Sequence, residues 1–284
     1  MPEPLYTAEN CKPSFQLLWT LALFWNAPAP DASTWLDHVK EIVEPDGVRI
    51  LEHHQRSPTV SQFLLSTKPS VTPADAIRSV KGRLQHHVRR DLPRAFQRNY
   101  SIKSVGEVKG EVVEQYVRSQ LDHHVMADAR VQETLASLQF VQPGVDLTET
   151  RRSSHGEFIY NLHLVFVHAE RWHEIRPEVL ENIRSMILGA SCKKGHLLSS
   201  SGILSDHVHL TLGCSLTESP LELGLGYLNN LTYAQGMRRV YQYGFYAGTF
   251  GPYDLGAIRK YTAAPAQPTE PQPLHRPRAG GGQD

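Results

Sequence analysis

Two histidines separated by one residue, His207 and His209, lie in a short apolar run whose pattern predicts a β-strand. Side chains at i and i+2 of a strand leave the same face of a sheet, so both imidazoles can reach one cation. Neutral imidazole is a common metal ligand. The spacing therefore predicts a metal site, although a surface pair or core histidines would give the same pattern in a chain with 15 histidines.

A tyrosine and a glutamine, Tyr116 and Gln120, are four residues apart in the stretch 111–120, whose pattern predicts a helix. At this spacing the two side chains project from one helix face about one turn apart. A chemical role for the tyrosine competes with core packing that leaves its hydroxyl at the rim.

Basic residues are concentrated between positions 78 and 103, where eight of them accompany a single acid, Asp91. Such side chains suit phosphates, although a solvated helix face has the same composition. The stretch 223–248 has two arginines, Arg238 and Arg239, together with five tyrosines. We therefore expect the first cluster to contact DNA, with Lys81, Arg83, Arg89, Arg90 and Arg94 as the candidates.

The sequence also carries an internal repeat. Similar strand-like or glycine-ended segments recur at offsets of 145 to 147, and a tyrosine, Tyr116 or Tyr261, stands ten residues after each repeated glycine. The paired segments are 15–19 with 160–164, 60–65 with 207–212, and 100–106 with 245–251. An offset that barely changes over a domain length predicts two copies of one unit.

Each copy has the pattern β-α-β-β-α-β-α, with amphipathic helices expected at 33–44 and 177–190. The predicted fold class is α+β, as two tandem ferredoxin-like domains that each pair an antiparallel sheet with helices. The predicted borders are 1–121 for the first domain, 122–156 for a connector, 157–264 for the second domain and 265–284 for a disordered tail. Within the connector, a helix is expected at 127–140 and a turn at Pro143-Gly144.

Composition describes an ordinary globular protein, with 40% hydrophobic and 20% charged residues. The net charge is zero, so any nucleic-acid binding must come from local clusters. Three cysteines without a CxxC spacing argue against a disulfide framework or a cysteine metal site. The longest apolar stretch, 15–25, is too short to span a membrane. We expect a cytoplasmic protein with no membrane partner.

The order of these parts resembles the single-tyrosine HUH transposases, including the REP-associated tyrosine transposases. The resemblance covers about residues 14–122 and 157–263. Its most specific elements are Asp206-His207-Val208-His209-Leu210, Lys81-Gly82-Arg83, the segment 100–106, and Tyr116 with Gln120.

The resemblance implies a metal-dependent transesterification. In this family two histidines and a glutamine hold a divalent metal, magnesium or manganese, that polarises the scissile phosphate. A tyrosine then attacks the phosphorus and keeps the 5′ phosphate as a phosphotyrosine, which a free 3′ hydroxyl can reverse. The matching positions imply Tyr116 as nucleophile and His207, His209 and Gln120 as metal ligands.

Neither half alone matches the family pattern. The first half has Val60 and Gln62 where the second has its histidines, and the second half has Pro265 where the first has Gln120. Because many family members are dimers whose tyrosine helix completes the partner's site, we expect a fused pseudodimer that keeps one composite site. Tyr261 would then face the lost site and be vestigial, like Val60 and Gln62.

These inferences predict a monomeric single-stranded DNA endonuclease and strand transferase acting on single-stranded or hairpin DNA. A first alternative is a domesticated protein that binds DNA hairpins but no longer cuts. A second is a structural or RNA-binding pair of ferredoxin-like domains. Metal-dependent nicking separates the first alternative from the enzyme, and metal and single-stranded DNA binding separate the second.

Overall fold

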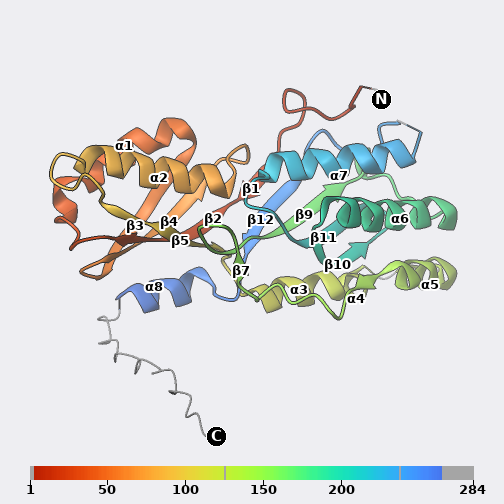
Figure 1. Cartoon of the computed structure of the whole chain (residues 1–284). Helices are drawn as coiled ribbons and strands as arrows, with labels where there is room; N and C mark the ends of the chain where they lie inside the picture. Colours follow the sequence, from red (N-terminus) through yellow and green to blue (C-terminus); the bar gives the residue numbers. More distant parts are fainter. Residues whose placement is uncertain (1–2, 125, 237, 264–284) are drawn as a thin grey trace, which may run out of the picture.

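The computed structural model describes residues 3–124, 126–236 and 238–263. Two six-stranded sheets lie side by side and carry helices on both faces (Figure 1). The first sheet has the order β3-β4-β2-β5-β8-β7 and the second has the order β1-β12-β9-β11-β10-β6. The strands are β1 Ser14–Gln16, β2 Leu18–Trp25, β3 Val48–Ser57, β4 Val60–Thr67, β5 Phe96–Val105, β6 Phe140–Val141, β7 Arg151–Arg152, β8 Gly156–Ile159, β9 Asn161–Val167, β10 Leu197–Ile203, β11 His207–Gly213 and β12 Tyr246–Phe250.

Helices join these strands in the same order in both halves, which gives β-α-β-β-α-β-α twice. The central strands run antiparallel in the orders β5-β2-β4-β3 and β12-β9-β11-β10. The predicted α+β, ferredoxin-like fold class is therefore confirmed. The helices are α1 Leu36–Val43, α2 Pro73–Val88, α3 Gly110–Arg118, α4 Gln120–His123, α5 Ala129–Leu138, α6 Pro177–Lys194, α7 Pro220–Ala234 and α8 Leu255–Ala263.

Strand alternation decides which face of each sheet holds the core. In β2, the side chains of Trp19, Leu21, Leu23 and Trp25 are at most 1% exposed, and Leu162, Leu164 and Phe166 of β9 are fully buried. Because alternate residues leave opposite faces, these side chains pack under α1 and α2 or under α6 and α7 (Figure 1). The other face of the second sheet is left to Asn161, His163 and the β11 histidines.

Both long second helices begin in the same way. The hydroxyl of Thr72 accepts a hydrogen bond from the backbone N–H of Asp75, and Pro73 opens α2. In α7 a serine, Ser219, forms a capping box with Glu222, and a proline again follows the cap. A side-chain acceptor and a proline both suit the unpaired N–H groups of a first helical turn, so local sequence fixes these starts.

Strand register gives the repeat residue by residue. Leu18 pairs with Ser66 and Val105, whereas Asn161 pairs with Gly213 and Phe250. The β4/β11 offset of 147 and the β5/β12 offset of 145 agree with the sequence. The predicted offset of 145 for the first strands is wrong, because Leu18 corresponds to Asn161, an offset of 143. A two-residue shift preserves the alternation of a strand, so both alignments place equivalent side chains on the same face of the sheet.

Each half gives one short strand to the sheet of the other half. Strand β1 pairs in parallel with β12 of the second sheet, and β8 pairs in parallel with β5 of the first. Two hydroxyls lock the crossing: Leu18 N–H donates to Thr249 Oγ1 at 2.8 Å, and Asn161 N–H donates to Ser104 Oγ at 3.0 Å. The two contacts are equivalent under the repeat, so the halves meet through an approximate two-fold relation.

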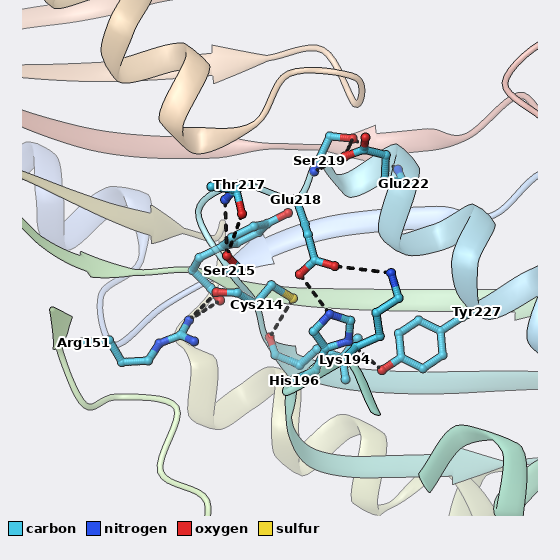
Figure 2. Close-up of polar contacts among 12 residues, drawn as sticks. Arg151, Lys194, His196, Cys214, Ser215, Thr217, Glu218, Ser219, Glu222 and Tyr227 are labelled. Carbon is cyan, nitrogen blue, oxygen red and sulfur yellow. Dashed lines mark hydrogen bonds and ion pairs between the residues drawn. The ribbon is translucent and has the colours of Figure 1, made fainter. Parts of the chain in front are cut away.

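The connector contains the expected helix as α5, and it adds strands β6 and β7 to the two sheets. Its Arg151 donates to the carbonyl oxygens of Cys214 at 2.7 Å and Tyr160 at 3.1 Å (Figure 2). Beside it, His196 is held between the hydroxyl of Tyr227 and the carboxylate of Glu218, each at 3.0 Å. This polar network ties the connector to one end of the second sheet.

Among the described residues, no helix combines the length and the apolar character that crossing a membrane requires. The predicted disordered tail, residues 265–284, lies outside the described residues, as does Pro265.

Candidate active site

The tyrosine helix of the first half, α3, lies on the second sheet (Figure 1). The ring of Tyr116 stands edge-on to the ring of His209, with 5.6 Å between their centroids. Its side chain is 47% exposed, so a ligand can approach the phenol from solvent. The structure thus brings Tyr116 and His209 together although they are 93 positions apart in the sequence.

Two glycines that are equivalent in the repeat, Gly106 and Gly251, let the chain cross between the sheets. After β5, Gly110 N–H donates to Gly251 O at 2.8 Å, and after β12, Leu255 N–H donates to Gly106 O at 2.9 Å. A Cβ atom on Gly251 would lie 2.2 Å from Ser104 O, and one on Gly106 would lie 2.9 Å from Val108 O. Side chains at these positions would force the backbones apart, so the repeated glycine is what permits each tyrosine helix to reach the other half's sheet.

The two predicted histidine ligands share one face of β11. Their ring centroids are 4.9 Å apart, and both side chains are buried. The Nδ1 atom of His207 is 2.6 Å from Asp206 Oδ1, which leaves its Nε2 as the nitrogen available to a ligand. Burial lowers the pKa of His207, against the effect of Asp206, and lowers that of His209 to about 2. Both imidazoles are therefore neutral at pH 7, as a metal ligand must be.

A third histidine, His163 of β9, completes this face and was not predicted. Its Nε2 is 2.9 Å from Nδ1 of His209, and the two rings are stacked at 16°. Burial lowers the pKa of His163 to about 4, so the pair shares one hydrogen between neutral rings. When Nδ1 of His209 donates, its Nε2 carries a lone pair. The repeat alone could not show this contact, because it depends on the register between β9 and β11, in which His163 pairs with Thr211 and His209 with Val165.

The glutamine lies where the sequence predicts, but the helix does not run through it. Helix α3 ends at Arg118, Ser119 turns the backbone, and Gln120 begins α4. The predicted unbroken helix over 111–120 is therefore wrong at its end. The amide Nε2 of Gln120 donates to Tyr116 O at 2.9 Å, which keeps the two residues adjacent. Gln120 is 1% exposed and lies over Gly202, the cross-strand neighbour of His209.

Tyr261 of α8 lies over the first sheet, at a cavity that Gln62 also lines. The register aligns Val60 with His207 and Gln62 with His209, as the sequence predicted. The guanidinium of Arg56 lies 4.2 Å from the centre of the Tyr261 ring and donates to its carbonyl oxygen. This second tyrosine therefore faces positions that lack histidines.

Residues 29–120 match the family described as "Transposase IS200 like". This segment is thus similar to the IS200-like transposases. No curated protein matches the sequence. Among solved structures, a candidate transposase from Deinococcus radiodurans R1 has 17% identity over 38% of this chain and 92% of its own, with a TM-score of 0.30. The "REP associates tyrosine transposase bound to a REP hairpin" has 13% identity over 40% and 67%, with a TM-score of 0.29.

The match confirms the family resemblance for the half that carries Tyr116 and Gln120, whereas the histidine pair lies outside the matched residues. Both TM-scores are below 0.5, so neither superposition supports a conclusion about function. The functional interpretation rests on the side chains of this chain.

The transposase-type metal site can be tested against the donors present. Two buried atoms near Tyr116, His209 Nε2 and Gln120 Oε1, have no hydrogen-bond partner among the described residues. Buried polar atoms without partners are costly, so each is suited to a ligand. No group of three or more His, Cys, Asp or Glu side chains in the described chain could hold a metal. The donors that fit are two histidines and a glutamine, a set of imidazole nitrogens and an amide oxygen that could bind a divalent cation.

The predicted DNA contacts divide into two groups. The ammonium of Lys81 donates to the carbonyl oxygens of Gln97 and Arg98, and Arg83 pairs with Asp46 at 3.0 Å. By contrast, the remaining three candidates form no ion pair with another described residue. They are Arg89, Arg90 and Arg94, and all three are exposed.

We expect charge reversal at the exposed pair, Arg89→Glu with Arg90→Glu, to weaken binding of single-stranded DNA. Each lost phosphate contact should also flatten the slope of log K against log salt by about 0.7. Fluorescence anisotropy titrations at salt concentrations from about 50 to about 300 mM would measure both the affinity and this slope. The matched control is Arg238→Glu with Arg239→Glu in the second half. Equal losses in the two variants would contradict an asymmetric grip.

We expect His163→Phe to lower the affinity for Mn²⁺ by about 10- to 100-fold, because it removes the partner that orients His209. Electron paramagnetic resonance of free Mn²⁺ gives the dissociation constant without DNA or activity. His155→Phe changes an exposed histidine and serves as the control. Unchanged Mn²⁺ affinity in a folded His163→Phe protein would show that this hydrogen bond has no role in the site.

Proposed function

We propose that the chain is a metal-dependent endonuclease and strand transferase for single-stranded or hairpin DNA, with one composite active site. The observation that supports it most is the position of Tyr116, from the first half, against His209 on the second sheet. Gln120 accompanies the tyrosine, whereas Tyr261 faces Gln62. Of the two tyrosines related by the repeat, Tyr116 is therefore the one that lies beside the histidine pair.

The proposed reaction is a transesterification at phosphorus. The phenolic oxygen of Tyr116 forms a bond to phosphorus, the bond to the 3′ oxygen breaks, and the leaving strand takes a proton as a 3′ hydroxyl. The 5′ phosphate stays on the tyrosine, and attack by a 3′ hydroxyl reverses the step. Because one phosphate ester replaces another, cleavage and rejoining need no external energy source.

Side chains of this chain supply the setting for that reaction. His207, His209 and Gln120 would hold Mg²⁺ or Mn²⁺, which supplies charge that stabilises the phosphate in the transition state. Asp206 orients His207 and His163 orients His209 through the hydrogen bonds at their Nδ1 atoms. The exposed ring of Tyr116 leaves the phenol open to a DNA strand.

The same proposal includes the origin and state of the chain. The repeated topology, with offsets of 143, 145 and 147, supports a tandem fusion of two family domains, of which the first is matched as such. One chain holds all the site residues, so we propose a monomer that acts as an intramolecular pseudodimer.

Nicking of single-stranded DNA tests the function. Pools of 3′-labelled oligonucleotides and hairpins with single-stranded flanks are incubated with Mn²⁺, Mg²⁺ or a chelator. We expect metal-dependent nicks and a labelled covalent adduct, since the tyrosine keeps the strand on the 3′ side of the cut. Binding without nicking or adduct would instead support an inactive hairpin-binding protein.

A further inference from the structure

A cavity of about 480 Å³ separates α8 from the first sheet, on the side of the molecule opposite α1 and α2 (Figure 1). The side chains that could interact with a ligand there come from β2, β4, β5, α8 and the segment just before α8. They are Thr20, Gln62, Ser101, Lys103, Tyr253 and Tyr261. Its volume falls within the range of about 300 to 1,000 Å³ that is usual for small-ligand sites.

The repeat explains why this space is open. On the second sheet, the equivalent positions carry rings that fill it: His163 corresponds to Thr20 and Tyr246 to Ser101. The rings of His163 and Tyr246 are 5.8 Å apart, beneath Tyr116. Loss of those rings in the first half leaves a cavity where the second half has its candidate active site.

One substitution adds a charge instead of removing volume. The register places Lys103, which lines the cavity, where the second sheet has Gly248, and at Gly248 the room for a side chain is taken by the ring of Tyr246. Lys103 is half-buried and forms no ion pair with another described residue. No acidic side chain lines the cavity in the described chain, so its electrostatic character favours an anion.

Aromatic rings form the outer wall. Tyr253 and Tyr261 are 55% and 59% exposed, and Arg56 packs against the Tyr261 ring at 4.2 Å. Open aromatic faces stack with unpaired bases of any sequence, and lysine pairs with phosphate. A cation at the base of a cavity and rings at its mouth match the two parts of a nucleotide.

We propose that this cavity binds one unpaired nucleotide of a single DNA strand, with its phosphate at Lys103 and its base against the tyrosines. The inference rests on the proposed function in that it takes DNA as the substrate. It also gives a role to the half that has no histidine pair, because that half holds the strand while the other site acts.

The test uses the full chain in chelator, so that no cleavage occurs. An oligonucleotide of deoxythymidine with single 5-iodo-deoxyuridine substitutions is photo-crosslinked, and the modified peptide is mapped by mass spectrometry. We expect a crosslink between residues 253 and 261. Anisotropy should show that Ser101→Tyr, which restores the ring of the other half, and Lys103→Gln each raise the dissociation constant roughly tenfold. The control Lys193→Gln, at an exposed lysine of α6, should leave it unchanged.

The outcomes separate the cavity from the chemistry. Two results together would overturn the inference: no crosslink between residues 253 and 261, and wild-type affinity in both Ser101→Tyr and Lys103→Gln. This holds even if the wild-type chain forms its covalent adduct when metal is present. Conversely, a crosslink between residues 253 and 261, without a covalent adduct when metal is present, would support nucleotide binding in the cavity and reject the proposed enzyme. Binding of deoxythymidine monophosphate without a crosslink to the oligonucleotide would identify a free nucleotide as the ligand and contradict a strand.

Discussion

Tyr116→Phe is expected to eliminate the covalent protein–DNA adduct, whereas Tyr261→Phe should still form it. The substitution removes a single oxygen, and at position 116 that oxygen is the nucleophile of the composite site. The fold should be unaffected, since the ring stays in place over His209 and is half exposed. We expect the adduct to fall by at least about 10³-fold, because the substitution removes the proposed nucleophile.

The measurement is the yield of adduct on a 3′-labelled oligonucleotide, followed by mapping of the modified peptide. A site assembled within the second half would use Tyr261 beside His209, and the two phenotypes would then be exchanged. The structure favours the first outcome because α8 lies over the first sheet at Gln62. An adduct on the peptide with Tyr261 would therefore refute the composite site while leaving the family assignment intact.

The second large effect is expected from the histidines. His207→Ala or His209→Ala should lower the rate of cleavage by roughly 10³-fold or more, while DNA binding remains. Each substitution removes an imidazole that is proposed as a metal ligand. Gln120→Ala should weaken Mn²⁺ binding and slow cleavage without removing the nucleophile. Binding of Mn²⁺, nicking rate and DNA affinity are measured in parallel.

The control for this series is Gln62→Ala, which changes the position equivalent to His209 in the first half. It should leave Mn²⁺ affinity unchanged, since Gln62 and Val60 offer no imidazole. Cleavage at the wild-type rate in the double variant of His207 and His209 would remove the metal from the mechanism.

Much of the fold could be predicted because local sequence fixes it. Alternating apolar residues indicated the strands that became β2 and β9, and apolar periodicity indicated the helices expected at 33–44 and 177–190, which lie at α1 and α6. The repeat then related the halves, and it also indicated that Tyr261 would face Gln62. Each of these inferences depends on neighbours in the sequence or on a fixed offset.

What the sequence did not reveal depends on contacts between distant segments. The pairing of His163 with His209 requires the register between two strands, and Lys81 lies against backbone carbonyls that no composition indicates. The break at Ser119 depends on how α3 ends on the second sheet. The exchange of β1 and β8 likewise adds strands that pair in parallel with a strand of the other half, β12 or β5.

That exchange has a consequence for the way the molecule unfolds. Strand β1 covers the edge of β12, and β8 covers the edge of β5, so melting either half would expose a sheet edge in the other. One hydrophobic cluster also runs through both halves, with Trp19 against Tyr160 at 5.0 Å. The halves therefore form a single cooperative unit. A chain that lost residues 1–121 would lose this shared stability together with Tyr116, the proposed nucleophile.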